Sequence, residues 1–228
     1  MTDIQLHFIE QGQGQPLVLL HGNGENCNYF EHQISYFSRN YRVIAIDTRG
    51  HGKSPRGGKP FSIKQFSEDL KDCLNAMNIA KTMLLGFSDG GNIALEFALK
   101  YPERVEKLIL NGANLFPSGV KAIYQWPIEA GYRMAKLFAK KSEKARQNAE
   151  MLGLMVNEPN VDPSELARLT MPVLVVAGSK DMIKEPHTRL IYKSLPNAQL
   201  NIIEGDHFVA NKNPEAFNEV VNRFLSLK

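Results

Sequence analysis

A serine in a short glycine-rich segment could carry nucleophilic chemistry. Residues 86–91 read Gly-Phe-Ser-Asp-Gly-Gly, and Ser88 is the third of them. The segment follows an apolar run and begins a run with helical spacing, which is the setting of a nucleophile elbow. Small residues two positions before and after the serine let other backbone approach it, and a helix N-terminus directs free N–H groups at the reacting centre. The pattern predicts that Ser88 is a nucleophile.

A nucleophilic serine needs a base, and the base needs a group that orients it. Among the six histidines, His207 stands directly after the last run that reads as a strand. A loop after a strand opens at the carboxyl edge of a parallel sheet, where ligands bind, so His207 is the predicted base. We expect His7 to be structural, in the first strand, and His32 and His187 to lie on the surface.

Asp181 is the predicted acid that orients this base. It ends the sequence Gly-Ser-Lys-Asp, directly after the apolar run 173–177. The chain order serine, aspartate, histidine is also the order that accompanies a nucleophile elbow. Asp206 is the alternative acid, but it is adjacent to His207, and neighbouring residues of a loop point apart. A turn or capping role therefore suits Asp206 better.

Two backbone N–H groups are predicted to stabilise an oxyanion beside the serine. Residues 21–24 read His-Gly-Asn-Gly after the apolar run 17–20, and such small residues let an N–H group face the nucleophile. We assign the first donor to the N–H of Asn23 and the second to the N–H of Asp89, which follows the serine. The alternative for residues 21–24 is a plain glycine turn.

Short apolar runs predict the strands that must position these residues. They do not alternate with polar residues, which is typical of strands buried on both faces in a parallel sheet. Segments with helical spacing lie between them, for example 63–77 and 93–98. The alternation predicts an α/β fold, a mostly parallel sheet flanked by helices with right-handed crossovers. The runs are 17–20, 43–46, 83–87, 108–110 and 173–177.

Weaker patterns stand at the two ends of the chain. Residues 4–9 alternate apolar and polar side chains and predict an antiparallel strand near an edge of the sheet. Residues 199–203 predict a further strand after a turn. Residues 214–225 predict a final helix with its apolar side chains turned inward.

One stretch, residues 115–162, breaks the alternation. It has no convincing strand, and its aromatic and methionine residues recur at helical spacing, which predicts a short helical cap inserted between two strands. The α/β core would then comprise residues 1–114 and 163–228. Residues 121–146 carry seven basic and two acidic residues. A solvated helix face explains this excess, and steering of anions is the alternative.

Composition excludes several classes of protein. Of 228 residues, 43% are hydrophobic and 22% charged, which is typical of a globular domain, and the net charge of +3 does not indicate nucleic-acid binding. The two cysteines, Cys27 and Cys73, are far apart, so neither a disulfide scaffold nor a zinc site is expected. No signal sequence or membrane-spanning run is visible. We therefore expect a cytoplasmic protein with no membrane partner.

Together these segments resemble the α/β-hydrolase fold superfamily, in its branch with a serine nucleophile. Within it, the Gly-x-Ser-Asp-Gly-Gly elbow followed by Gly-Ala-Asn at 112–114 resembles the valacyclovir-hydrolase-like esterases. In this family residues 47–54 would form a structural loop, so Arg49 and His51 are not expected to be catalytic. The family usually has one more strand before the one at 4–9, and often a longer cap. The matching segments are 21–24, 47–54, 86–91, 178–181 and 205–207.

The resemblance implies a carboxylesterase-like enzyme that cleaves small-molecule esters without metal or organic cofactor. Ser88 would attack the carbonyl carbon, His207 would transfer protons, and Asp181 would orient the imidazole. A carbon–carbon hydrolase, a lyase or a cofactor-free perhydrolase uses similar residues, and a ligand-sensing protein could retain the same triad. The oligomeric state stays open.

The carboxylate of Asp89 has two possible roles. It could stabilise the helix N-terminus, where negative charge is favoured. Alternatively, it faces the pocket and attracts a cation such as the α-amino group of an amino-acid ester. The resemblance favours the second role, because valacyclovir-hydrolase-like enzymes cleave amino-acid esters, whereas the basic segment 121–146 argues against it.

Overall fold

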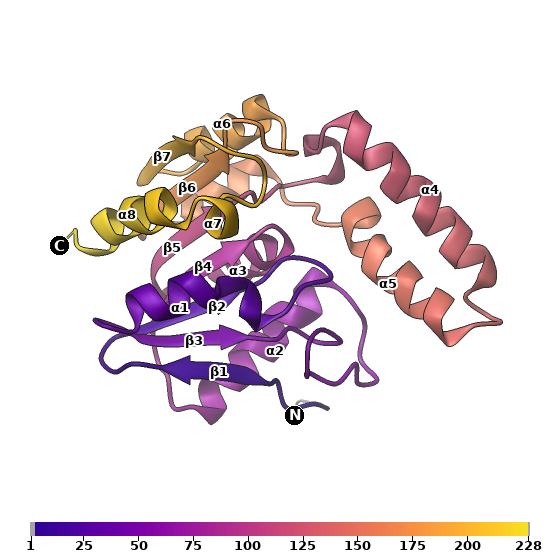
Figure 1. The fold of residues 1–228 in the computed structure, drawn as a ribbon, viewed down its shortest axis with the longest axis horizontal. Coiled ribbons are helices and arrows are strands. Elements are labelled where there is room, and N and C mark those ends of the chain that lie inside the picture. The colour runs from indigo at the N-terminus through magenta and orange to yellow at the C-terminus, as the bar shows by residue number, and fades with distance from the viewer. Residues whose placement is uncertain (1–2, 228) are drawn as a thin grey trace.

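The computed structural model describes residues 3–227 and has a central seven-stranded sheet (Figure 1). The strands lie in the order β1-β3-β2-β4-β5-β6-β7. Only the β1–β3 pair is antiparallel, and β1 lies at the edge. The predicted fold class is therefore confirmed. The strands are β1 Phe8–Gln11, β2 Pro16–Leu20, β3 Arg42–Ile46, β4 Thr82–Phe87, β5 Val105–Asn111, β6 Val173–Gly178 and β7 Ala198–Ile203.

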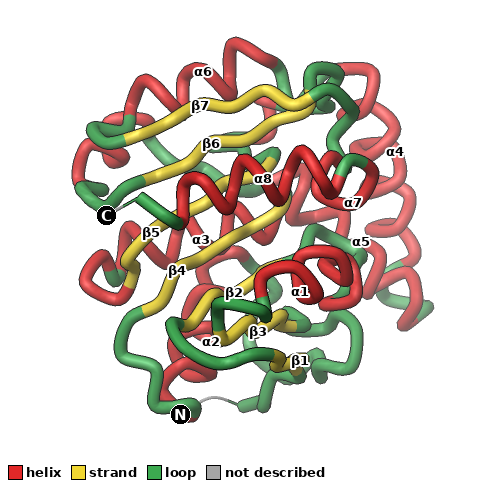
Figure 2. The backbone as a smooth tube through the Cα atoms, turned by 60° about the vertical axis from the view of Figure 1, so that its left-hand side comes forward, coloured by secondary structure: helices red, strands yellow, loops and turns green. Residues whose placement is uncertain are grey.

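Helices cover both faces of the sheet (Figures 1 and 2). Consecutive side chains of a strand point to opposite faces, so Leu84 packs in the layer with α2, α3 and α6, whereas Leu85 packs with α1 and α8. Both faces of β4 are buried, which explains its uninterrupted apolar sequence. The helices are α1 Glu31–Phe37, α2 Ile63–Ala76, α3 Asp89–Lys100, α4 Ala122–Phe138, α5 Glu143–Asn157, α6 Glu185–Ser194, α7 Val209–Lys212 and α8 Pro214–Leu225, with short 3-10 turns η1 Cys27–Phe30, η2 Pro102–Arg104, η3 Pro117–Gly119 and η4 Pro163–Arg168.

The first strand differs from the prediction of residues 4–9. Strand β1 begins at Phe8, so His7 precedes it, and Ile4 and Leu6 instead pack into the α2–α3 side of the core. An alternation of apolar and polar residues indicates which side chains are buried. It does not require the backbone to pair with a neighbouring strand.

Residues 115–162 lie between β5 and β6 and form the hairpin of α4 and α5, which projects beyond the carboxyl edge of the sheet (Figures 1 and 2). Apart from an isolated bridge between Val120 and Ile183, this stretch has no strand. The side chain of Ser142 caps α5 by accepting a hydrogen bond from the N–H of Ala145. Trp126 and Phe138 of α4 are exposed and do not pack on the sheet.

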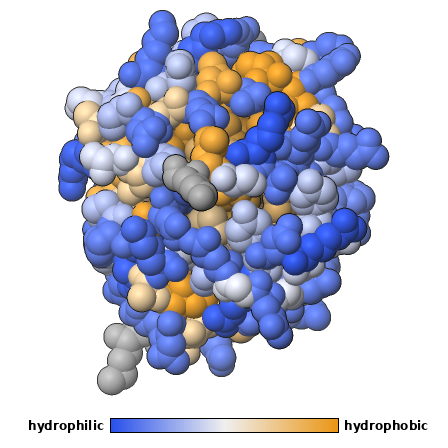
Figure 3. Space-filling model, turned by 90° about the vertical axis from the view of Figure 1, so that its left-hand side faces the viewer, coloured by the Kyte–Doolittle hydropathy of each residue, from blue (hydrophilic) through white to orange (hydrophobic). Residues whose placement is uncertain are grey.

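Figure 3 shows the face of the molecule that lies on the left in Figure 1, away from the α4–α5 hairpin. This face is mostly hydrophilic, with separate apolar patches. Within residues 3–227 no helix has both the length and the apolar character needed to cross a bilayer.

Candidate active site

Ser88 lies at the turn between β4 and α3, in a backbone conformation that is rare for a residue with a side chain. Its φ is +51° and its ψ is −122°. Such a conformation costs on the order of 1–3 kcal/mol and persists only where the surrounding structure enforces it. A Cβ atom at Gly90 would lie 2.0 Å from the carbonyl oxygen of Leu20, and one at Gly86 would lie 2.2 Å from the carbonyl oxygen of Gly90. The two glycines are therefore required by the close approach of β2, β4 and α3.

A chain of hydrogen bonds joins Ser88, His207 and Asp181. Nε2 of His207 lies 3.0 Å from Oγ of Ser88, and Nδ1 of His207 lies 2.7 Å from Oδ1 of Asp181. The N–H of Ile183 donates to Oδ1 and the N–H of Gly178 to Oδ2 of the same carboxylate. A carboxylate held in this way keeps the proton on Nδ1 and leaves Nε2 free to accept the serine proton.

The structure thus brings together three residues that the sequence separates by up to 119 positions. Each follows the carboxyl end of a strand: Ser88 follows β4, Asp181 follows β6 and His207 follows β7. Gly112, after β5, has a φ of +63°, and a Cβ there would lie 2.6 Å from the imidazole carbon Cε1 of His207. This glycine makes room for the base.

Asp206, the alternative acid, points elsewhere. Its Oδ1 accepts a hydrogen bond from the N–H of Phe208, and its Oδ2 pairs with the ammonium group of Lys212. It therefore caps the turn before α7, as the sequence predicts for it.

The loop with Asn23 lies against the N-terminus of α3. A Cβ at Gly90 would also lie 2.5 Å from the carbonyl oxygen of His21, which shows how closely the two segments approach. Asp89 is the first residue of α3, where backbone N–H groups have no partner within the helix. The two predicted donors are thus on neighbouring segments beside Ser88.

Two side chains that the sequence did not assign hold this loop in shape. Buried His21 accepts a hydrogen bond at Nε2 from the N–H of Thr48, and its Nδ1 lies 2.7 Å from the carbonyl oxygen of Gly22. Burial lowers the pKa of His21 to about 4, so its ring is neutral. Glu25 closes the turn on itself: its N–H donates to the carbonyl oxygen of Gly22, and its carboxylate accepts the N–H of Gly22.

Glu25 also belongs to the electrostatics of the site. Burial raises the pKa of its carboxyl to about 7, although the N–H of Gly22 and the nearby His207 both favour the ionised form. The charge of Glu25 therefore changes close to neutral pH, in the electrostatic neighbourhood of His207.

The side chain of Asn23 connects the same loop to the hairpin. Its amide donates a 2.7 Å hydrogen bond to the carbonyl oxygen of Met151 in α5. A second link joins Arg56 to Glu150, with 2.6 Å between their charged groups. The sequence assigned only the backbone of Asn23, because a partner 128 residues away leaves no local signal.

Asp89 is buried under the hairpin with half of its carboxylate unsatisfied. Its Oδ1 accepts a hydrogen bond from the amide of Asn92, and that amide also donates to Asn114. Its Oδ2 has no hydrogen-bond partner among residues 3–227. Burial raises the pKa of Asp89 to about 6, partly offset by Asn92 and Asn23. One oxygen of the carboxylate is therefore buried without a compensating donor.

His187 is not on the surface, so that expectation is wrong. The residue is buried, and its Nε2 accepts a hydrogen bond from the N–H of Leu115 at the beginning of the 115–162 stretch. Its position near Pro186 in the first turn of α6 gave no sign of this contact, since it depends on a segment 72 residues away. His32 is exposed, as expected.

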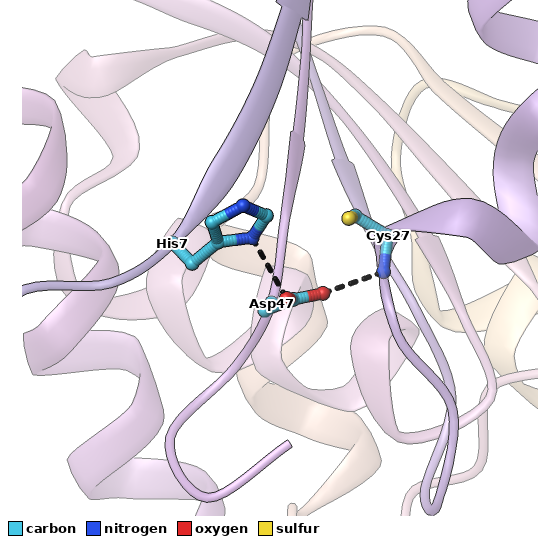
Figure 4. Close-up of side chains that lie close together, drawn as sticks. All are labelled: His7, Cys27 and Asp47. Atoms are coloured by element: carbon cyan, nitrogen blue, oxygen red, sulfur yellow. Dashed lines mark hydrogen bonds and ion pairs between the residues drawn. The ribbon is translucent and has the colours of Figure 1, made fainter. Parts of the chain in front are cut away.

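Figure 4 shows a cluster away from Ser88 in which atoms of His7, Cys27 and Asp47 that could bind a metal lie within 4.8 Å of one another. The Asp47 carboxylate already accepts the N–H groups of Cys27 and Lys53, and it lies 2.8 Å from Nδ1 of His7. Burial raises the pKa of the Cys27 thiol to about 12, whereas a metal would need the thiolate. The cluster is better suited to joining three chain segments than to holding an ion.

These features place the chain in a known class: it belongs to the α/β-hydrolase fold family, whose model matches residues 15–148. Human serine hydrolase BPHL is 30% identical, over 99% of this chain and 84% of that protein. 3-Oxoadipate enol-lactonase 2 of Acinetobacter baylyi is 26% identical, over 98% of this chain and 94% of the enzyme.

A solved structure has the same fold. The meta-cleavage product hydrolase CumD of Pseudomonas fluorescens superposes with a TM-score of 0.80 and 24% identity, covering 97% of this chain and 94% of the other. The chain is thus a hydrolase of the α/β fold, and its relatives include a serine hydrolase and an enol-lactonase.

Proposed function

We propose that this protein is a serine hydrolase that cleaves small-molecule carboxylic esters through an acyl-enzyme. The hydrogen-bonded chain of Ser88, His207 and Asp181 at the carboxyl edge of the sheet is the observation that carries the proposal. His207 accepts the serine proton while Oγ attacks the ester carbonyl, then donates it to the leaving alcohol. Water, activated by the same imidazole, releases the acid. Ser88 regains its proton from His207, and both residues return to their starting states.

The backbone N–H groups of Asn23 and Asp89 are proposed to stabilise the oxyanion. Both belong to segments held rigidly by their neighbours, so they need little reorganisation as charge develops. The carboxylate of Asp181 supports the imidazolium that forms during each proton transfer. Residues 115–162 are proposed to act as a cap over this site, joined to the oxyanion loop by Asn23 and Met151.

Turnover of p-nitrophenyl acetate tests the ester proposal directly. We expect steady release of p-nitrophenol, with no lag and no requirement for metal. Labelling of the protein by one equivalent of a fluorophosphonate without turnover would instead support a ligand-binding protein. Cleavage of a carbon–carbon bond in a vinylogous diketone, with no ester turnover, would move the protein to the second class of hydrolase.

We propose further that the preferred esters carry a cationic amine. The unpartnered Oδ2 of Asp89 supports this, since a buried ionised carboxylate is unfavourable unless a cation compensates it. The residue also adjoins Ser88, so an amine close to the ester carbonyl would be within its reach. The α-amino group of an amino-acid ester has that geometry.

An N-acetyl analogue provides the matched control for this role of Asp89. We expect the wild type to show a higher kcat/KM for a free amino-acid ester than for its N-acetyl analogue. The preference should disappear in Asp89→Asn, and in the wild type it should weaken below about pH 6, because the protonated carboxyl cannot pair with an ammonium group. If the ratio of kcat/KM for the two esters is the same in the wild type and in Asp89→Asn, the carboxylate only stabilises the helix N-terminus.

Thermal stability gives an independent measure of the same carboxylate. Because its pKa is raised in the folded state, the folded protein binds this proton more tightly than the unfolded chain does. The wild type therefore loses stability as pH rises through about 6, and Asp89→Asn is expected to have the higher Tm above that pH.

A further inference from the structure

The outward face of α4 is apolar along its whole length. Ile123 and Leu137 are each 75% exposed, Trp126 is 71% exposed and Met134 is 59% exposed. With Ala130 they recur every three or four residues, so they share one side of the helix. We call these five residues the α4 stripe. Large exposed apolar patches on a folded domain mark interaction sites.

The opposite side of α4 is already occupied. Its Gln125 side chain donates to the carbonyl oxygen of Met155 in α5, and Gly131 approaches Leu152 of α5. Helix α4 lies at the outer edge of the molecule (Figures 1 and 2), and the exposed residues of the α4 stripe are on the side of the helix away from α5. It is therefore available to a partner in the structure of the single chain.

The order of residues in the α4 stripe is symmetric about Ala130. Ile123 and Leu137 stand seven residues to either side of it, and Trp126 and Met134 stand four residues to either side. Two such helices, packed antiparallel across a two-fold axis at Ala130, would place Ile123 against Leu137 and Trp126 against Met134, with the two Ala130 side chains between them. The small alanine at the centre lets the helices approach closely. Self-complementarity of this kind is what a two-fold interface requires.

The charges beside the α4 stripe fit the same arrangement. Glu129 and Arg133 lie on one flank of α4, and the side chain of Arg133 is 80% exposed. The helix rises about 1.5 Å per residue, so in the antiparallel pair Glu129 of one copy stands within about 3 Å, measured along the axis, of Arg133 in the other. The two side chains lie 4.0 Å apart within α4, and in the dimer each would also face the opposite charge of the partner copy.

Antiparallel packing also separates the basic ends of the two hairpins. Lys140 and Lys141 of the two copies would stand about 30 Å apart along the axis, since each lies ten or more residues from Ala130. That separation exceeds the screening length of about 8 Å at physiological ionic strength. The same packing brings Lys121 of one copy to the level of Lys140 of the other, and the ammonium group of Lys121 donates a hydrogen bond to the carbonyl oxygen of Asp181 within its own chain.

We propose that the α4 stripe binds a second copy of this chain, forming a two-fold dimer through antiparallel α4 helices. Helix α4 has 17 residues and is about 25 Å long. A single pair of such helices is smaller than a standard interface of about 800 Å² per partner, so the dimer exchanges with monomer.

Substitution at the centre of the α4 stripe tests the pairing. Sedimentation equilibrium from about 1 to 500 µM should show a mass that rises from monomer to dimer. Ala130→Glu places two carboxylates against each other on the two-fold axis and should leave monomer over the whole range. The residue is exposed in the single chain, so folding is unaffected. Ala167→Glu, the same change at an exposed alanine of η4, should dimerise like the wild type.

A charge exchange then tests the register. Glu129→Arg and Arg133→Glu are each expected to weaken dimerisation, and the double variant is expected to restore it. A wild type that stays monomeric at 500 µM, or dimers that survive Ala130→Glu, would overturn the proposal. So would a monomer that binds phosphatidylglycerol vesicles through Trp126, because the α4 stripe would then be a membrane-binding surface.

Discussion

Ser88→Ala is expected to remove ester turnover while the fold stays intact. Loss of a triad nucleophile costs on the order of 10⁴ or more in kcat, because no other side chain can form the acyl-enzyme. The residual rate measured with p-nitrophenyl acetate should approach that of the uncatalysed reaction. Ser35→Ala, at an exposed position on α1, is the matched control and should keep full activity.

The positive φ of residue 88 also predicts how substitutions there change the Tm. Alanine at a φ of +51° retains the conformational strain of the serine, whereas glycine does not. Ser88→Ala should therefore keep the wild-type Tm, and Ser88→Gly should be more stable and equally inactive. Turnover by Ser88→Ala within tenfold of the wild type would show that the nucleophile lies elsewhere, as would fluorophosphonate labelling at another residue.

Asp181→Asn is expected to lower kcat by roughly 10³ to 10⁴. With the NH2 group of the asparagine facing Nδ1, that nitrogen must act as the acceptor, so the ring adopts the tautomer in which Nε2 is protonated and cannot accept from Ser88. KM for the same ester should change little, because Asp181 lies behind the imidazole and away from the substrate. The N–H groups of Gly178 and Ile183 donate to different oxygens of the carboxylate, and the asparagine can accept only one of these two bonds.

Asp206→Asn separates the two aspartates beside the base. Its carboxylate faces Lys212 and the N–H of Phe208, so this variant should retain most of the activity and lose at most a little stability. His207→Ala should be as inactive as Ser88→Ala. An inactive Asp206→Asn together with an active Asp181→Asn would show that Asp206, and not Asp181, orients the base.

The sequence alone determined the sheet and the placement of the candidate triad. Strands β2 to β6 are buried on both faces, so their apolar runs carry no polar interruptions and can be read directly. Once those strands and β7 are parallel, Ser88, Asp181 and His207 lie at the same edge of the sheet, because each follows the carboxyl end of a strand. The elbow is also local: Gly86 and Gly90 are needed within a single turn.

Contacts between distant segments were decided only by the tertiary structure. The bond from Asn23 to Met151, the burial of His187 against Leu115 and the turn closed by Glu25 depend on how loops from separate strands meet. The spacing of apolar residues predicts which side of a helix or strand is buried. It does not predict which other segment packs on that side. Helix α4 shows the same point: its apolar spacing is that of a packed helix, yet the fold leaves this side exposed.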